Sequence, residues 1–351
     1  MKIDHVHFYV EDAKVWRDWF VHHLGFQPVT DRSNSFHTCT EVVKNGAVCF
    51  FLSSPLLPTS PVAEFLRQYP PGVADVAFAV EDVETAIALA QKHGATILQP
   101  VQERQVGTAF IKCGKIAAWG GLTHTLIERS LVFDKGQKTN DNTFTAIDHV
   151  VLNVAVGELE RAVAWYENIL DFQPQQAFKI KTNRSALHSQ VMISRNGSVQ
   201  LPINEPASRN SQIQEFLDVN QGAGIQHIAL RTTNLVSAIA KFRASGLSLL
   251  SVPQTYYSQL KQRPGLTLSP LELEAIAQQE ILVDWQEYTP LEGGNTAPLL
   301  LQIFTQPIFE QPTFFFEFIE RRFQAQGFGE GNFRALFEAI ESEQIKRGTL
   351  Q

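Results

Sequence analysis

The sequence contains little cysteine and no long hydrophobic run, and both absences narrow the class of protein. Its three cysteines, Cys39, Cys49 and Cys113, share no repeating spacing. They predict neither a disulfide framework nor a zinc site, so we expect reduced thiols that fill space. No apolar stretch approaches the length of a membrane span, and the first residues lack the apolar core of a signal peptide. We therefore expect a cytoplasmic protein with no membrane contact.

Concentrated positive charge is also missing. The 351-residue chain has a net charge of −7, and its nearest approach to a basic run is the pair Arg321-Arg322. Because nucleic-acid surfaces need clustered lysine and arginine, the sequence argues against a nucleic-acid partner. The chain is long enough for two or more domains with a large core.

Three polar residues stand inside otherwise apolar, strand-like runs. They are His149 in the run 147–154, His227 in the run 224–230 and Glu317 in the run 313–321. A carboxylate flanked by phenylalanines is costly to bury unless something pairs with it. Two imidazoles and one carboxylate form the facial triad of non-heme Fe(II) oxygenases, which leaves coordination positions open for substrate and O2. The set predicts one divalent metal, which we expect to be iron, used for oxygen chemistry.

Each of these residues also has an ordinary interpretation. A strand histidine is usually a hydrogen-bonded core or surface residue, and a strand glutamate usually faces solvent. The metal interpretation gains weight because an internal repeat singles out the same positions.

The two halves of the chain repeat each other. The run 3–6 matches 147–150, and the run 72–78 matches 224–230. The second pair leads into predicted helices that end near Gly94 and Gly246, as suits a helix C-terminus. We expect each helix to lead into an apolar strand that closes at Pro100 or Pro253. The order of elements predicts an α+β fold of tandem βαβββ modules, two to each half.

A polar stretch over 134–142, which contains Gly and Asn, has the composition of a linker. We predict an N-terminal domain over 1–133, a linker over 134–144 and a C-terminal domain over 145–351. The first half has His5, but Asp75 stands where the second half has His227. Its run 125–129 matches either Glu317 or Glu320, so a His/Asp/Glu site in the first half stays open. We interpret this half as a structural module that has lost its site.

Five phrases in order carry a family resemblance. They are LPINEP at 201–206, SQIQEFL at 211–217, GAGIQH at 222–227, LQIFT at 301–305 and GFGEGNF at 327–333. Together with the repeat they resemble the 4-hydroxyphenylpyruvate dioxygenase family of the vicinal oxygen chelate superfamily. The resemblance covers nearly the whole chain, weakly in the first half and strongly after Thr145. It implies a glyoxalase-like fold, with a curved half-barrel sheet in each of two pseudo-repeated domains.

The resemblance implies a reaction as well. One Fe(II) per chain converts 4-hydroxyphenylpyruvate and O2 to homogentisate and CO2 by oxidative decarboxylation, ring hydroxylation and side-chain migration. The substrate supplies its own oxo acid, so no 2-oxoglutarate is needed. A homodimer or homotetramer fits the family. The sequence leaves open whether homogentisate serves tyrosine breakdown or prenylquinone synthesis.

The resemblance also assigns roles to residues. The metal ligands are His149, His227 and Glu317. The substrate-binding residues are Ser189, Pro202, Asn204, Gln212, Gln226, Gln302, Phe304, Phe315, Phe328, Phe333 and Leu336. Gln226, Gln302, Phe315 and Asn332 are assigned to catalysis. Phenylalanine more often packs in a core, and Gln and Asn are mostly exposed, so these roles depend on the resemblance.

The C-terminal segment 331–343 predicts an amphipathic helix, with Phe333, Leu336, Phe337 and Ile340 on one face. The resemblance makes this helix a lid over the active-site mouth. An ordinary packing helix is the alternative. The preceding glycines at 327, 329 and 331 suit a hinge.

Three other functions compete. 4-Hydroxymandelate synthase uses the same substrate and iron but hydroxylates the benzylic carbon, and Pro202, Asn204 and Phe315 favour the dioxygenase pattern over it. A non-catalytic ligand-binding protein of the same fold would not need an intact triad. An extradiol ring-cleaving dioxygenase uses the same triad on related modules, but this function would not explain the phrases at 301–305 and 327–333.

Overall fold

The computed structural model describes residues 1–29, 35–106, 109–129, 142–182, 184–262, 265–266, 268–285 and 297–350. The predicted linker, 134–144, therefore lies mostly outside the described residues. Within these ranges, no helix is both long and apolar enough to cross a membrane.

The first half forms one eight-stranded sheet. Its strands are β1 (Lys2–Tyr9), β2 (Gln27–Val29), β3 (Thr38–Asn45), β4 (Val48–Pro55), β5 (Gly72–Ala79), β6 (Ile97–Val106), β7 (Ala109–Ala117) and β8 (Thr123–Arg129). Its helices are α1 (Ala13–Leu24), α2 (Pro61–Gln68) and α3 (Val83–Lys92), with a short 3₁₀ turn at Trp119–Gly121. The strand order is β2-β3-β4-β1-β5-β8-β7-β6.

The second half forms a second eight-stranded sheet of matching order, β10-β11-β12-β9-β13-β16-β15-β14. Its strands are β9 (Phe144–Asn153), β10 (Phe172–Lys181), β11 (Ala186–Ser194), β12 (Gln200–Pro206), β13 (Gly224–Thr232), β14 (Leu282–Trp285), β15 (Leu299–Phe304) and β16 (Phe315–Arg322). Its helices are α4 (Leu159–Leu170), α5 (Gln212–Asn220), α6 (Leu235–Ala244), α7 (Gln254–Leu260), α8 (Pro270–Gln278) and α9 (Glu330–Arg347).

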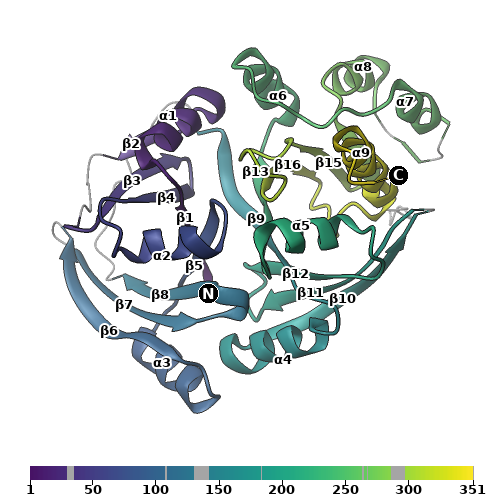
Figure 1. The fold of residues 1–351 in the computed structure, drawn as a ribbon. Coiled ribbons are helices and arrows are strands. Elements are labelled where there is room, and N and C mark those ends of the chain that lie inside the picture. The colour runs from purple at the N-terminus through teal and green to yellow at the C-terminus, as the bar shows by residue number, and fades with distance from the viewer. Residues whose placement is uncertain are drawn as a thin grey trace.

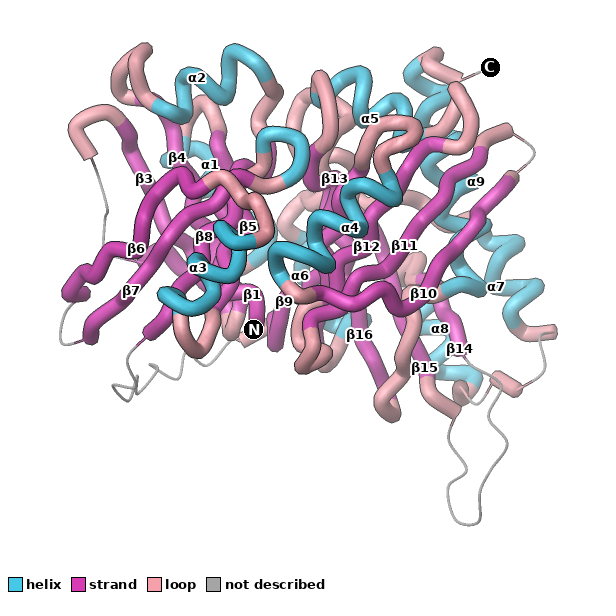
Figure 2. Tube along the Cα trace, turned by 90° about the horizontal axis from the view of Figure 1, so that it is seen from below, coloured by secondary structure: helices cyan, strands magenta, loops and turns pink. Residues whose placement is uncertain are grey.

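Both sheets curl into half-barrels that lie side by side, as the purple-to-blue and teal-to-yellow parts of Figure 1 show. In each sheet the two central strands, β1 and β5 or β9 and β13, run antiparallel. A parallel neighbour flanks each central strand: β4 and β8 in the first sheet, β12 and β16 in the second. The predicted tandem βαβββ fold is confirmed, with α7 and α8 inserted into the last module. Figure 2 shows β1 and β9 near the middle of the molecule and the C-terminus beyond α9.

Matching helices of the two halves begin and end by the same chemistry. Asp82 and Asn234 cap α3 and α6 by accepting backbone N–H groups of the first turn. Gly94 and Gly246 follow these helices with φ of +92° and +81°, a conformation that glycine adopts without strain. The first-half strand predicted to close at Pro100 instead runs on to Val106 as β6, with a shift in its pairing between Gln99 and Gln102. The strand predicted to close at Pro253 does not form, and that segment makes only an isolated bridge at Leu249 before α7 begins.

The triple phenylalanine at 314–316 fits the two-sided burial of β16. Alternate side chains of a strand face opposite ways. Phe314 and Phe316 pack on Phe8 and Phe50 of the first half, with ring centroids 5.2 Å and 5.8 Å apart. Phe315, between them, faces the interior of the second half-barrel. The chain is therefore apolar on both sides where β16 begins because both faces are buried there.

Candidate active site

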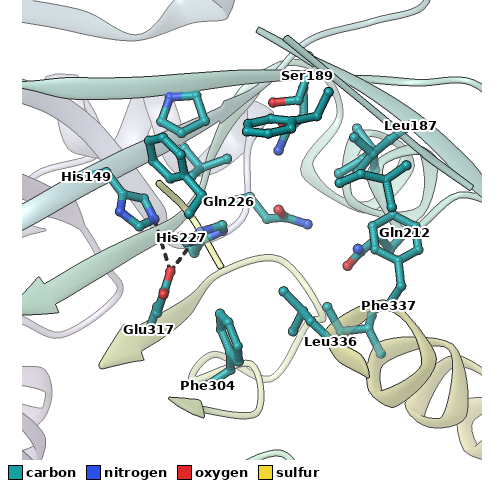
Figure 3. A pocket seen from close by; sticks show the side chains of 18 of the residues that line it. His149, Leu187, Ser189, Gln212, Gln226, His227, Phe304, Glu317, Leu336 and Phe337 are labelled. Atoms are coloured by element: carbon teal, nitrogen blue, oxygen red, sulfur yellow. Dashed lines mark ion pairs between the residues drawn. The ribbon is translucent and has the colours of Figure 1, made fainter. Parts of the chain in front are cut away.

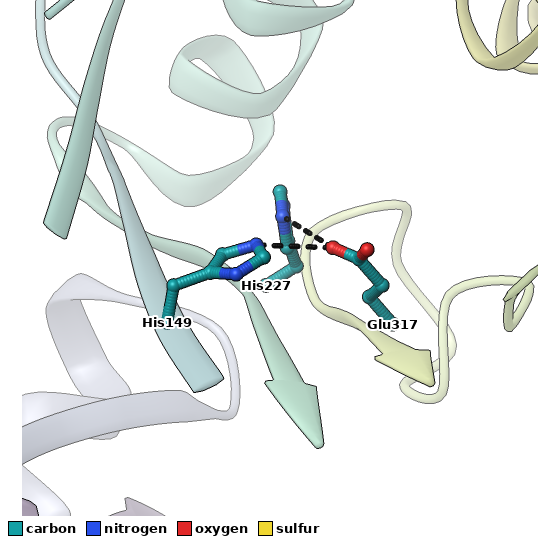
Figure 4. Close-up of side chains that lie close together, drawn as sticks. All are labelled: His149, His227 and Glu317. Atoms are coloured by element: carbon teal, nitrogen blue, oxygen red, sulfur yellow. Dashed lines mark ion pairs between the residues drawn. The ribbon is translucent and has the colours of Figure 1, made fainter. Parts of the chain in front are cut away.

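His149, His227 and Glu317 meet in the second half-barrel, on the adjacent strands β9, β13 and β16 (Figure 4). Glu317 Oε2 lies 3.0 Å from His149 Nε2 and 3.7 Å from His227 Nε2. One donor atom from each residue lies within 4.8 Å of the others. No other group of three His, Cys, Asp or Glu side chains converges in this way in the described ranges. Two imidazole nitrogens and one carboxylate oxygen suit Fe(II).

A bulge in β13 brings two consecutive side chains to the same cavity. The pairing of β13 with β9 shifts between Ile225 and His227, which leaves Gln226 out of register. A bulge re-aims side chains that a regular strand would send to opposite faces. Gln226 and His227 therefore both line the cavity.

His149 is oriented from behind by a buried carboxylate. Its Nδ1 donates to Asp148 Oδ1 at 3.1 Å, and Asp148 is in turn paired with Arg321 at 2.7 Å and Arg231 at 2.6 Å. Burial alone would raise the pKa of Asp148, but hydrogen bonds from Arg321 and His149 hold that pKa well below its usual range. The fixed carboxylate directs Nε2 of His149 toward Glu317, an arrangement typical of metal-bound histidines.

The two histidines differ in charge in the metal-free protein. Burial lowers the pKa of His149, but the carboxylates of Glu317 and Asp148 outweigh burial and raise it to about 9. Burial and the neighbouring His149 lower the pKa of His227 well below its usual range. His149 therefore carries the proton that offsets the buried Glu317, and a metal bound there would displace that proton.

Glu317 is held at its second oxygen by Gln302. Gln302 Nε2 donates to Glu317 Oε1 at 2.9 Å and to the carbonyl of Phe328 at 3.0 Å. Gln302 Oε1 accepts from Asn332 Nδ2 at 3.0 Å. Oε1 of the carboxylate is thus engaged by the protein, and Oε2 is left facing the two imidazoles.

The three ligand-type residues stand at one end of a cavity (Figure 3). Gln226 lies between them and Gln212, which reaches in from the opposite end beside Phe337. Rings line the end of the cavity that holds the three ligand-type residues, where Phe315 stacks on His227 with centroids 4.7 Å apart and Phe328 meets His149 edge-on at 5.2 Å. The cavity is a mostly apolar chamber with a few converging amides, the usual form of a small-molecule site.

Comparisons with known proteins place this geometry in a family. Residues 4–111 and 146–263 each match the family described as Glyoxalase/Bleomycin resistance protein/Dioxygenase superfamily. The 4-hydroxyphenylpyruvate dioxygenase of Coccidioides posadasii is 39% identical, over 99% of this chain and 94% of that protein. The enzyme of the same name from Caenorhabditis briggsae is 38% identical, over 99% and 93%.

The chain belongs to the 4-hydroxyphenylpyruvate dioxygenase family.

A solved structure of a triple mutant of 4-hydroxymandelate synthase from Streptomyces coelicolor matches the chain with a TM-score of 0.84 and 26% identity. The match covers 98% of both chains, so the tandem half-barrels and α9 have counterparts there.

The structure gathers most of the site residues that the sequence predicts for a 4-hydroxyphenylpyruvate dioxygenase. Besides the three ligand-type residues, the cavity is lined by Ser189, Pro202, Asn204, Gln212, Gln226, Gln302, Phe304, Phe315, Phe328 and Leu336. Asn332 is buried but outside the cavity lining, and it reaches the site only through Gln302. The side chain of Phe333 lies outside the described residues. The chemical roles of these residues stay predictions.

Sequence reasoning missed part of the site. The cavity is also lined by Val151, Phe178, Ile180, Leu187, Val191, Ile213, Phe337 and Ile340. Of these, only Phe337 and Ile340 had a visible signal, their place on the apolar face of the C-terminal helix. Asp148 had one too, since Asp precedes His in both copies of the repeated Ile-Asp-His phrase.

Proposed function

We propose that the chain is an Fe(II)-dependent dioxygenase that converts 4-hydroxyphenylpyruvate and O2 to homogentisate and CO2. The observation that carries this proposal is the convergence of Nε2 of His149, Nε2 of His227 and Oε2 of Glu317 at one end of a largely apolar cavity. These three side chains would hold one iron per chain. When bound, Fe(II) would supply a centre that chelates the 2-oxo acid and activates O2.

The polar supports of the triad keep its geometry ready. Asp148 fixes the ring of His149, and Gln302 fixes the free oxygen of Glu317. Because both supports are themselves buried and hydrogen-bonded, the ligand atoms need little rearrangement on metal binding.

The aromatic walls exclude water from the reacting carbons. Phe315 and Phe328 cover the two histidines, and Phe304 packs against Phe315 with ring centroids 6.2 Å apart. A dry, shaped chamber protects a reactive oxygen species from side reactions. The chamber also leaves an apolar, aromatic-lined space in which the flat phenol ring of the substrate can pack.

The amides away from the metal suit the phenol hydroxyl. Ser189 and Asn204 face each other across β11 and β12, with Gln226 and Gln212 nearby. Oε1 of Gln212 is buried and has no hydrogen-bond partner in the described part of the chain. A buried acceptor without a partner is costly, so a donor from the substrate is expected to satisfy it. We assign these four side chains to the phenol end.

We also propose that residues 1–133 form a structural domain and residues 145–351 the catalytic domain. All cavity-lining residues come from the second of these segments. Free cysteines and negative net charge support a cytoplasmic enzyme, and the family resemblance supports a dimer or tetramer.

The test is anaerobic loading with Fe(II), addition of 4-hydroxyphenylpyruvate and O2, and identification of the product. We expect one iron per chain and equal amounts of homogentisate and CO2. His227→Ala should abolish iron binding and product formation. His188→Ala should abolish neither, because His188 lies next to Ser189 on β11 but does not line the cavity. 4-Hydroxymandelate as the main product would replace the proposal with the benzylic hydroxylase, and no iron-dependent O2 uptake would favour a binding protein.

A further inference from the structure

A single line of hydrogen bonds joins α7, the first turn of α9 and the carboxylate of Glu317. The Tyr256 hydroxyl lies 2.9 Å from Asn332 Oδ1, Asn332 Nδ2 donates to Gln302 Oε1 at 3.0 Å, and Gln302 Nε2 donates to Glu317 Oε1 at 2.9 Å. Gln302, Asn332 and Glu317 are each at most 3% exposed. No water is needed to complete this line.

The chemistry of the groups fixes the orientation of the two amides, Gln302 and Asn332. Glu317 Oε1 and the carbonyl of Phe328 only accept, so Gln302 must present its Nε2 to them and its Oε1 to Asn332. Asn332 must then offer Nδ2 to Gln302 and Oδ1 to Tyr256. Both amides donate toward the carboxylate. The Tyr256 hydroxyl lies 2.9 Å from two acceptors, Asn332 Oδ1 and the carbonyl of Val283, and when it donates to Asn332 it extends a line in which neighbouring bonds strengthen one another.

The first turn of α9 depends on these side chains. No side chain occupies its N-cap, which is Gly329 with φ +78°. Instead, Asp284 Oδ2 accepts the N–H of Gly331 at 3.0 Å, and Tyr256 holds Asn332. The backbone of Val283 holds the Tyr256 hydroxyl, which accepts from the N–H at 2.8 Å and lies 2.9 Å from the carbonyl. This turn is therefore attached through side chains of α7 and β14 rather than by a cap of its own.

We propose that Tyr256 is a positioning residue that couples the start of α9 to the metal carboxylate through Asn332 and Gln302. If α9 leaves, Gln302 Oε1 loses its buried partner, and the amide that orients Glu317 is no longer constrained. Since α9 also carries Leu336, Phe337 and Ile340 into the cavity, closing the cavity and orienting the ligand become one event. Binding linkage makes the coupling reciprocal, so a bound metal holds the first turn of α9 in place.

The inference depends on the proposed metal site, and the experiment separates the two. Co(II), which needs no protection from O2, is titrated into the full-length protein, and amide hydrogen exchange is followed over residues 331–340 with and without it. In the unmodified protein we expect Co(II) to slow exchange in this segment. Tyr256→Phe should lose most of that protection and weaken Co(II) binding about 2–10-fold, the share of one hydrogen bond.

Tyr257→Phe is the matched control. Tyr257 is the next residue on α7, is buried, and donates to the carbonyl of Ile281 at 3.0 Å without touching Asn332. Its loss should leave Co(II) affinity and metal-dependent protection unchanged. Asn332→Ala breaks the same line at the next residue, so the double variant should bind Co(II) no more weakly than Asn332→Ala alone. Asn332→Ala by itself carries the test if Tyr256→Phe does not fold.

Three results would overturn the inference. Equal losses in Tyr256→Phe and Tyr257→Phe, or additive losses in the double variant, would make Tyr256 an ordinary packing residue. Tight Co(II) binding by the unmodified protein with no change in exchange at 331–340 would refute the coupling alone. Failure of the unmodified protein to bind Co(II) or Fe(II) would refute the proposed metal site as well.

Discussion

Glu128 and Glu320 occupy equivalent places in the two half-barrels. Glu128 Oε2 accepts the N–H of Val83 at the start of α3, at 3.1 Å, and Glu320 Oε2 accepts the N–H of Leu235 at the start of α6, at 2.7 Å. Each carboxylate interacts favourably with the positive, N-terminal end of the helix dipole. Glu128 is thus the counterpart of Glu320, and it has a structural task of its own.

This equivalence leaves Thr125 as the counterpart of Glu317. Asp75 pairs with Thr123 across β5 and β8, just as His227 pairs with Phe315 across β13 and β16. Two residues further along these strands, β8 has the hydroxyl of Thr125 where β16 has the carboxylate of Glu317. No metal-ligand triad forms in the described residues of the first half.

Replacing a ligand-type residue should remove the metal. His149→Ala, His227→Ala and Glu317→Ala should each lose bound iron and turnover, by more than the roughly 10–100-fold that outer-shell partners contribute. His5→Ala and Thr125→Ala, at the matching positions of the first half, should keep one iron per chain. Metal analysis of the purified variants measures this, and iron loss in the first-half variants would relocate the site.

Disturbing the support of His149 should affect the metal and the fold together. Asp148→Asn leaves Arg321 facing a neutral group, and we expect metal affinity to fall about 10–100-fold and stability by about 3–5 kcal/mol. The first half contains a matched pair, Asp4 and Arg129, also at 2.7 Å. Asp4→Asn should cost some stability and leave metal affinity unchanged. Equal metal affinities for Asp148→Asn and the unmodified protein would contradict the proposed role.

A methyl group at Gly329 should displace Gln302. A Cβ there would lie 1.9 Å from Gln302 Oε1, whereas a Cβ at Gly157 would meet nothing within 4 Å. Both glycines have similar φ, +78° and +81°, so the backbone strain of an alanine is matched, at about 1 kcal/mol. Thermal unfolding should show this shared cost in both variants. Iron affinity should fall only in Gly329→Ala, and equal affinities would argue against the Gln302 contact.

Phe315 should influence which carbon is oxidised, and Phe314 should not. Phe315 lines the cavity, while Phe314 packs on Phe8 of the other half. The product depends on which substrate carbon the pocket holds nearest the metal. Phe315→Ile should raise the ratio of 4-hydroxymandelate to homogentisate, and Phe314→Ile should lower stability at an unchanged ratio. Identical product ratios would place the selectivity elsewhere, with Asn204 the next position to vary.

Acid should destabilise the protein through His124. Its Nδ1 donates to the carbonyl of Val76, and its Nε2 accepts from the hydroxyl of Tyr166 in the other half. Burial lowers the pKa of His124 to about 4, against roughly 6.5 in the unfolded chain. As the pH falls from about 6.5 to 4, the unfolded state binds a proton that the native state does not. Stability therefore drops over this window, by roughly 3 kcal/mol from this group.

Urea unfolding at pH 7.5, 6 and 5 measures that dependence. His124→Gln should unfold more readily than the unmodified protein at pH 7.5 but lose less stability on acidification. Part of the slope should remain, since burial also lowers the pKa of His7 to about 3. An unchanged slope would mean that His124 is protonated in the native state.

The fold and the convergence of three ligand-type residues could be predicted because the local sequence contains a signal for each. The repeated Ile-Asp-His phrase exposed the duplication, and isolated polar residues in apolar strands exposed His149, His227 and Glu317. The sequence could not predict that the neighbouring residues Gln226 and His227 both line the cavity. This arrangement needs a bulge in β13, and no residue type in the sequence indicates one. The role of Tyr256 could not be predicted either. Tyr256 lies on α7, which has no counterpart between α3 and β6 of the first half, so the internal repeat does not single it out.

The aromatic packing on the back of β16 has a practical consequence for anyone who wishes to study the second half by itself. Phe314 and Phe316 carry no ligand, yet they are at most 1% exposed because Phe8 and Phe50 cover them. Expressed without the first half, a fragment starting near Thr145 would present these rings to water where the strand that carries Glu317 begins. Such a surface promotes self-association. The first half thus covers an apolar surface of the second, and truncation is expected to yield insoluble protein rather than a minimal enzyme.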